Sequence, residues 1–208
     1  IEAGKVFLNE KSCHLRQLVT TLMKMLRQQA ESKGLSLELE LGENLPDFII
    51  TDDAKLRQVL INLLGNAIKF TEHGGITLVV ENMESLDKGY HLLFAVEDTG
   101  VGIAGEEIET IFEVFGQSEA GRRSQTGTGL GLPISRKFVE IMGGQLTVES
   151  TLGVGSKFRF DIQAKKVESP ALKDVNPQPS SLNSAKVLVV DDNRSEERRV
   201  GKECRIGC

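Results

Sequence analysis

The chain has 208 residues, of which 39% are hydrophobic and 26% charged, and its formal net charge is −5. This size allows one domain with a buried core, or one domain and a fragment of a second. The acidic balance argues against a nucleic-acid binder, and no apolar run approaches the roughly 18 residues that a membrane span needs. The chain does not begin with methionine and shows no signal peptide. We therefore expect an internal fragment of a cytoplasmic protein, whose parent could still be anchored in a membrane.

Hydrophobic periodicity predicts alternating helices and strands in the first half of the chain. Apolar residues at three- and four-residue steps predict a helix over residues 11–30, which includes Cys13, and alternating leucines predict a half-buried strand over residues 35–41. A second helix is expected to begin at the capping side chains of residues 51–53 and to end at about Phe70. Shorter apolar runs predict strands over residues 48–50, 76–82 and 91–97, and the last two are joined by a turn at residues 87–89.

Two further helices and a strand pair are predicted in the second half. Residues 116–131 are rich in Gly, Ser, Thr, Gln and Arg, which is typical of a mobile loop. Interleaved helices and antiparallel strands favour an α+β fold, a two-layer sandwich with helices on one face of a mixed, mostly antiparallel sheet. The expected elements are a short helix over residues 106–115 with Ile108, Ile111, Phe112 and Phe115 on one side, a helix over residues 132–142 with Ile134, Phe138, Ile141 and Met142 facing inward, and strands over residues 145–150 and 157–163.

One face of the predicted helix that ends at Phe70 is polar. Asn62, Asn66 and Lys69 follow one another at steps of four and three residues, so they lie on one stripe opposite the leucines. Amide oxygens are neutral ligands for a hard cation such as Mg²⁺, and a lysine beside them neutralises phosphate. Taken alone, the stripe is better explained as a solvated helix face.

Two glycine-rich segments are candidates for contact with a ligand. Residues 98–102 (DTGVG) follow a predicted buried strand, where glycine admits a ligand close to the backbone and an aspartate in a dry pocket accepts a hydrogen bond from an amino group. An ordinary turn explains this segment equally well. Residues 127–132 (GTGLGL) stand at the start of a predicted helix, where backbone N–H groups and the helix dipole favour an anion. This segment is neither a Rossmann nor a Walker motif.

Together and in this order, the segments resemble the sensor histidine kinases. Residues 62–71 (NLLGNAIKFT) resemble the N box of that family, and residues 98–103 (DTGVGI) resemble its G1 box. The remaining resemblances are residues 112–115 (FEVF) to the F box, residues 127–132 to the G2 box, and residues 153–158 (GVGSKF) to the trailing glycine motif. We expect the last of these to form a hairpin turn with a second role in fixing the pocket. The resemblance covers residues 1–165 and implies the Bergerat ATP-binding fold.

The resemblance implies a role for each candidate residue. Asn66, helped by Asn62, would hold Mg²⁺ against the phosphates of ATP, and Lys69 would contact phosphate. Asp98 would bind the adenine amino group in a pocket shaped by Gly100 and Gly102. A lid over residues 116–131 would close on ATP, with its phosphates against the segment Gly127, Thr128, Gly129, Leu130 and Gly131 and with Phe112 and Phe115 as anchors. Arg122 and Arg123 are better explained as solvated loop charges than as contacts of the γ-phosphate.

The resemblance also divides the chain into parts. Residues 1–10 resemble the end of the dimerising helical hairpin that carries the phosphate-accepting histidine in this family, and residues 11–165 resemble the catalytic domain. None of the three histidines, His14, His73 and His91, matches the acceptor motif, so we interpret them as structural or exposed. The parent would be a homodimeric hybrid kinase whose partners are its phosphoacceptor helices and a receiver domain. No contact with nucleic acid or membrane is expected for this fragment.

The end of the chain reads differently. Residues 166–184 are rich in proline and serine and are interpreted as a linker, and residues 185–193 (AKVLVVDDN in sequence) resemble the first strand of a response-regulator receiver. Residues 194–208 carry a dense run of charges where a receiver would continue into an amphipathic helix. They resemble a sequencing adaptor read as protein, and we expect a non-native, disordered tail.

Two other functions are compatible with the same motifs. Hydrolases of this fold use a glutamate as the water-activating base four residues before the N-box asparagine, and here that position is Asn62, whose amide cannot take the proton. ATP hydrolysis is therefore disfavoured as the main activity. A non-catalytic nucleotide-binding or interaction module is disfavoured for the parent because every nucleotide box is intact, although the fragment lacks an acceptor histidine.

Overall fold

A seven-stranded sheet runs through the part of the chain that the computed structural model describes, which comprises residues 7–87, 89–116, 118, 121 and 129–167. All the pairings of the sheet are antiparallel except that of β2 with β4, so the predicted mixed, mostly antiparallel sheet is confirmed. The strand order is β1 (Lys11–His14), β3 (Phe48–Thr51), β7 (Gly155–Lys166), β5 (Gly89–Asp98), β4 (Gly75–Leu86) and β2 (Ser36–Leu41), and β6 (Leu146–Thr151) pairs with β7.

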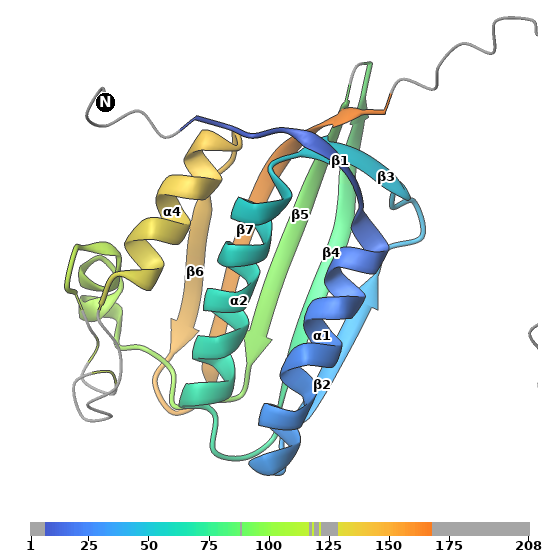
Figure 1. Cartoon of the computed structure of the whole chain (residues 1–208). Helices are drawn as coiled ribbons and strands as arrows, with labels where there is room; N and C mark the ends of the chain where they lie inside the picture. The colour runs from blue at the N-terminus through green and yellow to red at the C-terminus, as the bar shows by residue number, and fades with distance from the viewer. Residues whose placement is uncertain (1–6, 88, 117, 119–120, 122–128, 168–208) are drawn as a thin grey trace, which may run out of the picture. The chain divides into compact units, whose positions relative to one another are not determined.

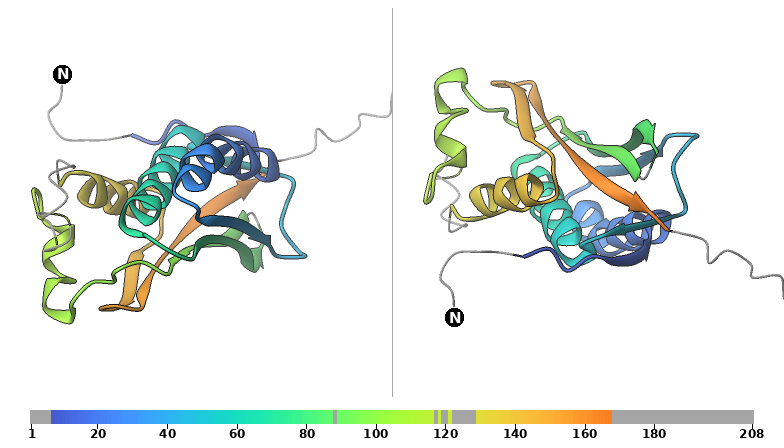
Figure 2. Two further views of the ribbon diagram at one scale, coloured as in Figure 1. Left: turned by 90° about the horizontal axis from the view of Figure 1, so that it is seen from below. Right: turned by 90° about the horizontal axis from the view of Figure 1, so that it is seen from above.

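Helices cover one face of this sheet. Figure 1 shows α1 (Leu15–Ser32), α2 (Asp53–Phe70) and α4 (Gly131–Ile141) lying side by side in front of the strands. The end-on views of Figure 2 separate a layer of helices from a layer of strands, which confirms the predicted two-layer sandwich. Within the described ranges, no helix is long and apolar enough to cross a membrane.

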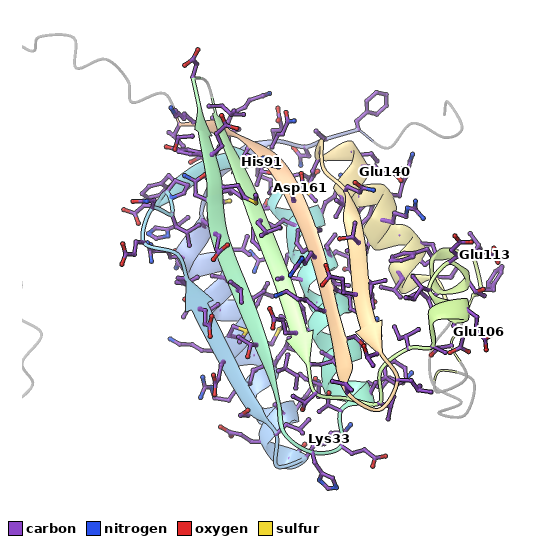
Figure 3. The ribbon with its side chains drawn as sticks, turned by 180° about the vertical axis from the view of Figure 1, so that it is seen from behind. Lys33, His91, Glu106, Glu113, Glu140 and Asp161 are labelled. Carbon is purple, nitrogen blue, oxygen red and sulfur yellow. The ribbon has the colours of Figure 1, made fainter. Side chains whose placement is uncertain are left out.

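The core lies between the two layers because apolar residues alternate along the central strands. Alternate residues are buried over the central part of these strands, namely Ile76, Leu78 and Val80 of β4, Leu92, Phe94 and Val96 of β5, and Phe158, Phe160, Ile162 and Ala164 of β7. Phe94 stacks on its cross-strand partner Phe160 with 4.8 Å between ring centroids. The leucines of α2 complete the core, which leaves the polar stripe of this helix outside the packed layer. The opposite face of the sheet, seen in Figure 3, carries polar pairs such as His91 and Asp161, whose Nε2 and Oδ2 atoms are 2.8 Å apart.

The first predicted helix begins four residues too early. Residues 11–14 form β1, which pairs residue by residue with β3, and the helix begins at Leu15. The backbone N–H of Gln17 donates to the imidazole Nδ1 of His14 at 3.3 Å, so His14 is the helix cap. Cys13 therefore lies half-buried in a strand and not in a helix. Pairing with a segment more than thirty residues away decides the conformation of these four residues.

The predicted helix over residues 106–115 is also wrong. Two single 3₁₀ turns, Gly105–Glu107 and Thr110–Phe112, take its place. Only Ile111 is buried in this segment, so most of a continuous amphipathic stripe would lie outside the core. Phe115 has a φ of 67° and is 72% exposed, which contradicts its predicted place on an inward side.

The last helix is confirmed, but its inward face is rotated from the prediction. Ile134 is 43% exposed, whereas Ser135 and Val139 are buried. Met142 is buried and Phe138 packs against the core, as predicted. Ser135 turns inward because the side-chain amide of Asn62 on α2 donates a hydrogen bond to its hydroxyl at 3.0 Å. A polar contact between the two helices thus replaces the apolar one that periodicity predicts.

Asp52 fixes the start of α2, as predicted from its capping side chain. Its Oδ1 accepts the backbone N–H of Lys55 at 3.0 Å, and its Oδ2 accepts both the Lys55 ammonium and the backbone N–H of Asn9. Burial alone would raise the pKa of Asp52, but these hydrogen bonds outweigh it and hold the pKa below its usual range.

We expect Asp52→Ala to lower the free energy of unfolding by on the order of 3 kcal/mol, because the change removes a cap and leaves Lys55 without its buried partner. The pKa of Asp52 is depressed in the folded state, so its contribution is present above the unfolded value of 3.8 and is lost as the pH falls below it. Urea unfolding at pH 7 and pH 3 measures both effects. A wild-type to variant difference that is as large at pH 3 as at pH 7 would contradict this assignment.

Candidate functional site

A cavity of about 240 Å³ opens beside α2, at the end of the sheet where β5 and β6 terminate. Its walls come from the polar stripe of α2, from the segment between β5 and α4, which includes the loop directly after β5, and from the start of α4. Most of the predicted site residues that the structure describes line it, namely Asn62, Asn66, Lys69, Asp98, Gly102, Gly129 and Gly131. Gly100 and Leu130 lie next to this lining, and Gly127 and Thr128 lie outside the described residues, as do Arg122 and Arg123.

The polar stripe of α2 forms one wall of the cavity. Asn62, Asn66 and Lys69 are each half-buried, which excludes the simple solvated face that the sequence alone favoured. Burial lowers the pKa of Lys69, whose ammonium lies 4.5 Å from the centroid of the Phe70 ring. Two amide side chains and a cation therefore share one partly desolvated surface.

The amide of Asn62 is held in place from two sides. Its Nδ2 donates to Ser135, which is 1% exposed, and its Oδ1 lies against Gly131. A Cβ at residue 131 would come within 2.2 Å of this oxygen, so α4 begins against the amide only because residue 131 is glycine. In the first turn of α4, Pro133 has no N–H and the N–H of Ile134 donates to the carbonyl of Leu130. The N–H groups of Gly131 and Leu132 precede the first hydrogen bond of the helix, so this wall presents donors and a positive dipole end.

Asp98, the last residue of β5, forms another wall of the cavity. Its Oδ1 accepts the backbone N–H of Gly100 at 2.9 Å. Burial raises the pKa of Asp98, although hydrogen bonds from the backbone of Gly100 and Ser156 act in the other direction. The carboxyl group is therefore a candidate acceptor in a poorly solvated pocket.

Glycines allow the chain to pack tightly behind Asp98. Gly102 has a φ of 68°, and a Cβ there would lie 2.1 Å from the carbonyl oxygen of Thr151. Gly155, in the β6–β7 turn, would place a Cβ 2.0 Å from the carbonyl oxygen of Asp98. The trailing glycine motif thus forms a hairpin turn and also abuts the pocket wall, in agreement with the prediction.

Apolar residues complete the cavity, and each lies in a sequence motif or a predicted helix without having been named as a site residue. Ile103, Ile111, Leu132 and Phe158 line it and pack on the core. Phe112 also packs against the core, whereas the exposed side chain of Phe115 does not; the backbone N–H of Phe115 instead donates to Gly129 at 3.1 Å. An apolar slot with a carboxylate, two amides, a lysine and a helix N-terminus suits a flat heterocycle joined to an anionic group.

These walls and the two-layer sandwich around them define an ATP-binding domain. The chain belongs to the family of histidine kinase-, DNA gyrase B- and HSP90-like ATPases, whose model matches residues 51–166. The matched range contains Asp98 and the three residues of the polar stripe, Asn62, Asn66 and Lys69.

Curated relatives are sensor proteins of bacteria. The aerobic respiration control sensor protein ArcB of Escherichia coli K12 is 37% identical over 194 residues, which cover 92% of this chain and 24% of ArcB. The sensory/regulatory protein RpfC of Xanthomonas campestris is 38% identical over 200 residues, which cover 90% of this chain and 27% of RpfC. The chain thus spans about a quarter of the length of the curated relatives that it matches.

Solved structures agree with this placement. Full-length ShkA in complex with AMPPNP has a TM-score of 0.68 and 33% identity, over 79% of this chain and 33% of ShkA. The catalytic domain of the histidine kinase ThkA has a TM-score of 0.62 and 28% identity, over 74% of this chain and 95% of that domain. Residues 51–166 are therefore a catalytic ATP-binding domain of the histidine kinase type.

Proposed function

We propose that the chain is the catalytic module of a hybrid sensor histidine kinase, which binds Mg²⁺-ATP and transfers the γ-phosphate to a histidine on a separate segment. The observation that carries the proposal is that Asp98 and the stripe of Asn62, Asn66 and Lys69 open onto one cavity. A hydrogen-bond acceptor for adenine and a set of groups for metal and phosphate are thereby combined. The partners would be the phosphoacceptor helices of a homodimeric parent and a receiver domain.

The side chains of this cavity fit a magnesium ion bound with nucleotide. Among the described residues, no group of three or more His, Cys, Asp or Glu side chains could hold a metal ion by itself. The amide oxygens of Asn66 and Asn62 instead offer neutral ligands, which suits an ion that keeps waters and phosphate oxygens as its other ligands. The ion would neutralise charge on the transferred group, and Lys69 would add a fixed positive charge beside it.

Each residue then has a separate task. Asp98 accepts a hydrogen bond from the base and so selects adenine, while Ile103, Ile111 and Phe158 exclude water from its faces. Gly129 and Gly131 allow the backbone to lie close to phosphate at the start of α4, and we assign the same task to Gly127, Thr128 and Leu130. Positioning and charge neutralisation are the work required for phosphoryl transfer.

Transfer to a separate acceptor tests the proposal. We expect no acid-labile label on the chain incubated alone with γ-labelled ATP, because none of its three histidines matches the acceptor motif: His14 caps α1, His73 lies in the turn after α2 and His91 pairs with Asp161 on the sheet. A separate polypeptide carrying a phosphoacceptor helical hairpin is expected to become labelled on its histidine. Acid-labile self-labelling of the chain would contradict this account, and release of phosphate without any labelling would favour an ATP hydrolase.

A further inference from the structure

Lys33 makes an unusual set of contacts for a residue at the end of a surface helix. It is the C-terminal cap of α1, yet its ammonium reaches the last turn of α2. Its Nζ donates to the carbonyl oxygens of Ile68 at 2.7 Å, Lys69 at 2.9 Å and Thr71 at 3.3 Å. An ammonium group has three protons to donate, so these three carbonyls use its full capacity.

The last turn of α2 has every terminal carbonyl paired. A helix leaves its last four carbonyls without partners in the helix, and here these belong to residues 67–70. The backbone N–H and the hydroxyl of Thr71 donate to Ala67, Lys33 donates to Ile68 and Lys69, and the backbone N–H of Val101 donates to Phe70 at 3.3 Å. Lys33 is the charged member of this set, and its charge stands at the negative end of the helix dipole.

This turn joins two walls of the cavity. Ala67, Lys69 and Phe70 line it from α2, and Val101 and Gly102 line it from the loop after β5. The carbonyl of Phe70 links the two walls, because it accepts the N–H of Val101 and also lies close to Gly100. A Cβ at residue 100 would be only 2.6 Å from the Phe70 carbonyl oxygen. A small shift of this carbonyl would therefore move the loop that follows Asp98.

We infer that Lys33 is a positioning residue of the nucleotide site, which acts from outside the cavity by fixing the last turn of α2 and, through Phe70, the loop over residues 98–102. The inference rests on the proposed function for its ligand. Lys33 is not among the residues that line the cavity. Its effect passes through the backbone of Lys69 and Phe70. Figure 3 places Lys33 at the end of the molecule where α1 terminates.

Other contacts hold the same loop and set the size of the expected effect. Thr99 links the loop to the turn after α2, because its hydroxyl donates to the carbonyl of His73 at 3.0 Å and accepts the N–H of Gly75 at 3.1 Å. Lys33 is itself exposed, so water can replace part of what its ammonium provides. We therefore expect a change of about fivefold in nucleotide affinity when Lys33 is removed, and not a complete loss.

The test compares, in the full chain, two lysines whose ammonium groups make contacts at opposite ends of α2. Lys33→Met removes the donors at the C-terminal end, Lys33→Arg keeps a charged donor there, and Lys55→Met removes the partner of Asp52 at the N-terminal end. Calorimetry with AMPPNP and Mg²⁺, well below each melting temperature, is expected to show a Kd raised about fivefold for Lys33→Met and partial rescue by Lys33→Arg. Lys55→Met should lower the melting temperature and leave Kd within about twofold of wild type, because it lies about 20 Å along the helix.

Amide hydrogen exchange without nucleotide separates this inference from the proposed function. Lys33→Met is expected to speed exchange at residues 98–102, and Lys55→Met is not. This result would support the positioning role even if the wild-type chain failed to bind AMPPNP. Unchanged exchange at residues 98–102 in Lys33→Met, or an equal rise in Kd for both methionine variants, would overturn it.

Discussion

Asp98→Ala is expected to weaken the binding of AMPPNP by about 100-fold, because the change removes an acceptor from a poorly solvated pocket and leaves the adenine amino group without a partner. Asp161→Ala is the matched control. Asp161 is likewise a half-buried aspartate at a strand, but it pairs with His91 and the backbone N–H of Gln145 and does not line the cavity. Calorimetry on both variants should show lost affinity in the first and near wild-type affinity in the second. Equal losses would show that Asp98 acts through stability alone.

The pH dependence of nucleotide affinity in the wild type and in Asp98→Ala gives an independent check. Burial raises the pKa of Asp98 above 3.8, so its carboxyl group takes up a proton in the folded state at a higher pH than in the unfolded chain. Stability from this group therefore falls as the pH rises from 3.8 through the raised pKa. The ionised carboxylate is the stronger acceptor, and it is lost as the pH falls. The difference in affinity between wild type and Asp98→Ala should therefore shrink as the pH falls. A constant difference down to pH 4 would argue against an ionised acceptor.

Asn66→Ala is expected to remove most of the gain in affinity that Mg²⁺ gives. In the proposed site its amide oxygen is a metal ligand, and loss of a ligand is expected to lower metal affinity by at least the roughly 10-fold that loss of an outer-shell partner costs. Binding of AMPPNP in the presence of EDTA should change much less, because the wall around Asp98 is intact. Asn82→Ala is a suitable control, since Asn82 is a half-buried asparagine on β4 that bonds to the carbonyl of Asn44. A loss of equal size with and without Mg²⁺ would contradict the ligand role of Asn66.

Regular elements with strong local signals could be predicted from the sequence. The helix α2 has a capping aspartate, a leucine stripe and a clear end, and the structure confirms its bounds closely as Asp53–Phe70. The strands β4 and β5 follow from alternation, although β4 extends to Leu86 through an irregularity between Asn82 and Glu84 that alternation does not reveal. In these segments local propensity and tertiary packing favour the same structure.

The errors occur where a distant partner decides the conformation. Residues 11–14 have a helical pattern but pair with β3, and residues 106–115 have an apolar stripe but bury only Ile111. Phe115 was expected to anchor a lid, and its side chain is instead exposed while its backbone is bonded to Gly129. Periodicity describes which side of an element is apolar and does not say what that side meets.

The cavity could be predicted only in part, because some of its supporting contacts join residues that are distant in sequence. Helical spacing places Asn62, Asn66 and Lys69 on one stripe, and a family resemblance adds Asp98. Ser135 and Lys33 could not be recognised, because their contacts join residues 73 and 35 positions apart and neither belongs to a motif. The roles assigned to all of these side chains remain predictions that the variants above can test.

The most direct test of the central claim is titration calorimetry of the full chain with AMPPNP and Mg²⁺. The proposed function predicts saturable binding at one site per chain, weakened by Asp98→Ala and made much less dependent on Mg²⁺ by Asn66→Ala. Absence of binding by a chain that is folded by circular dichroism would contradict it, and the cavity beside α2 would then be a relic of the family in a module that serves another interaction.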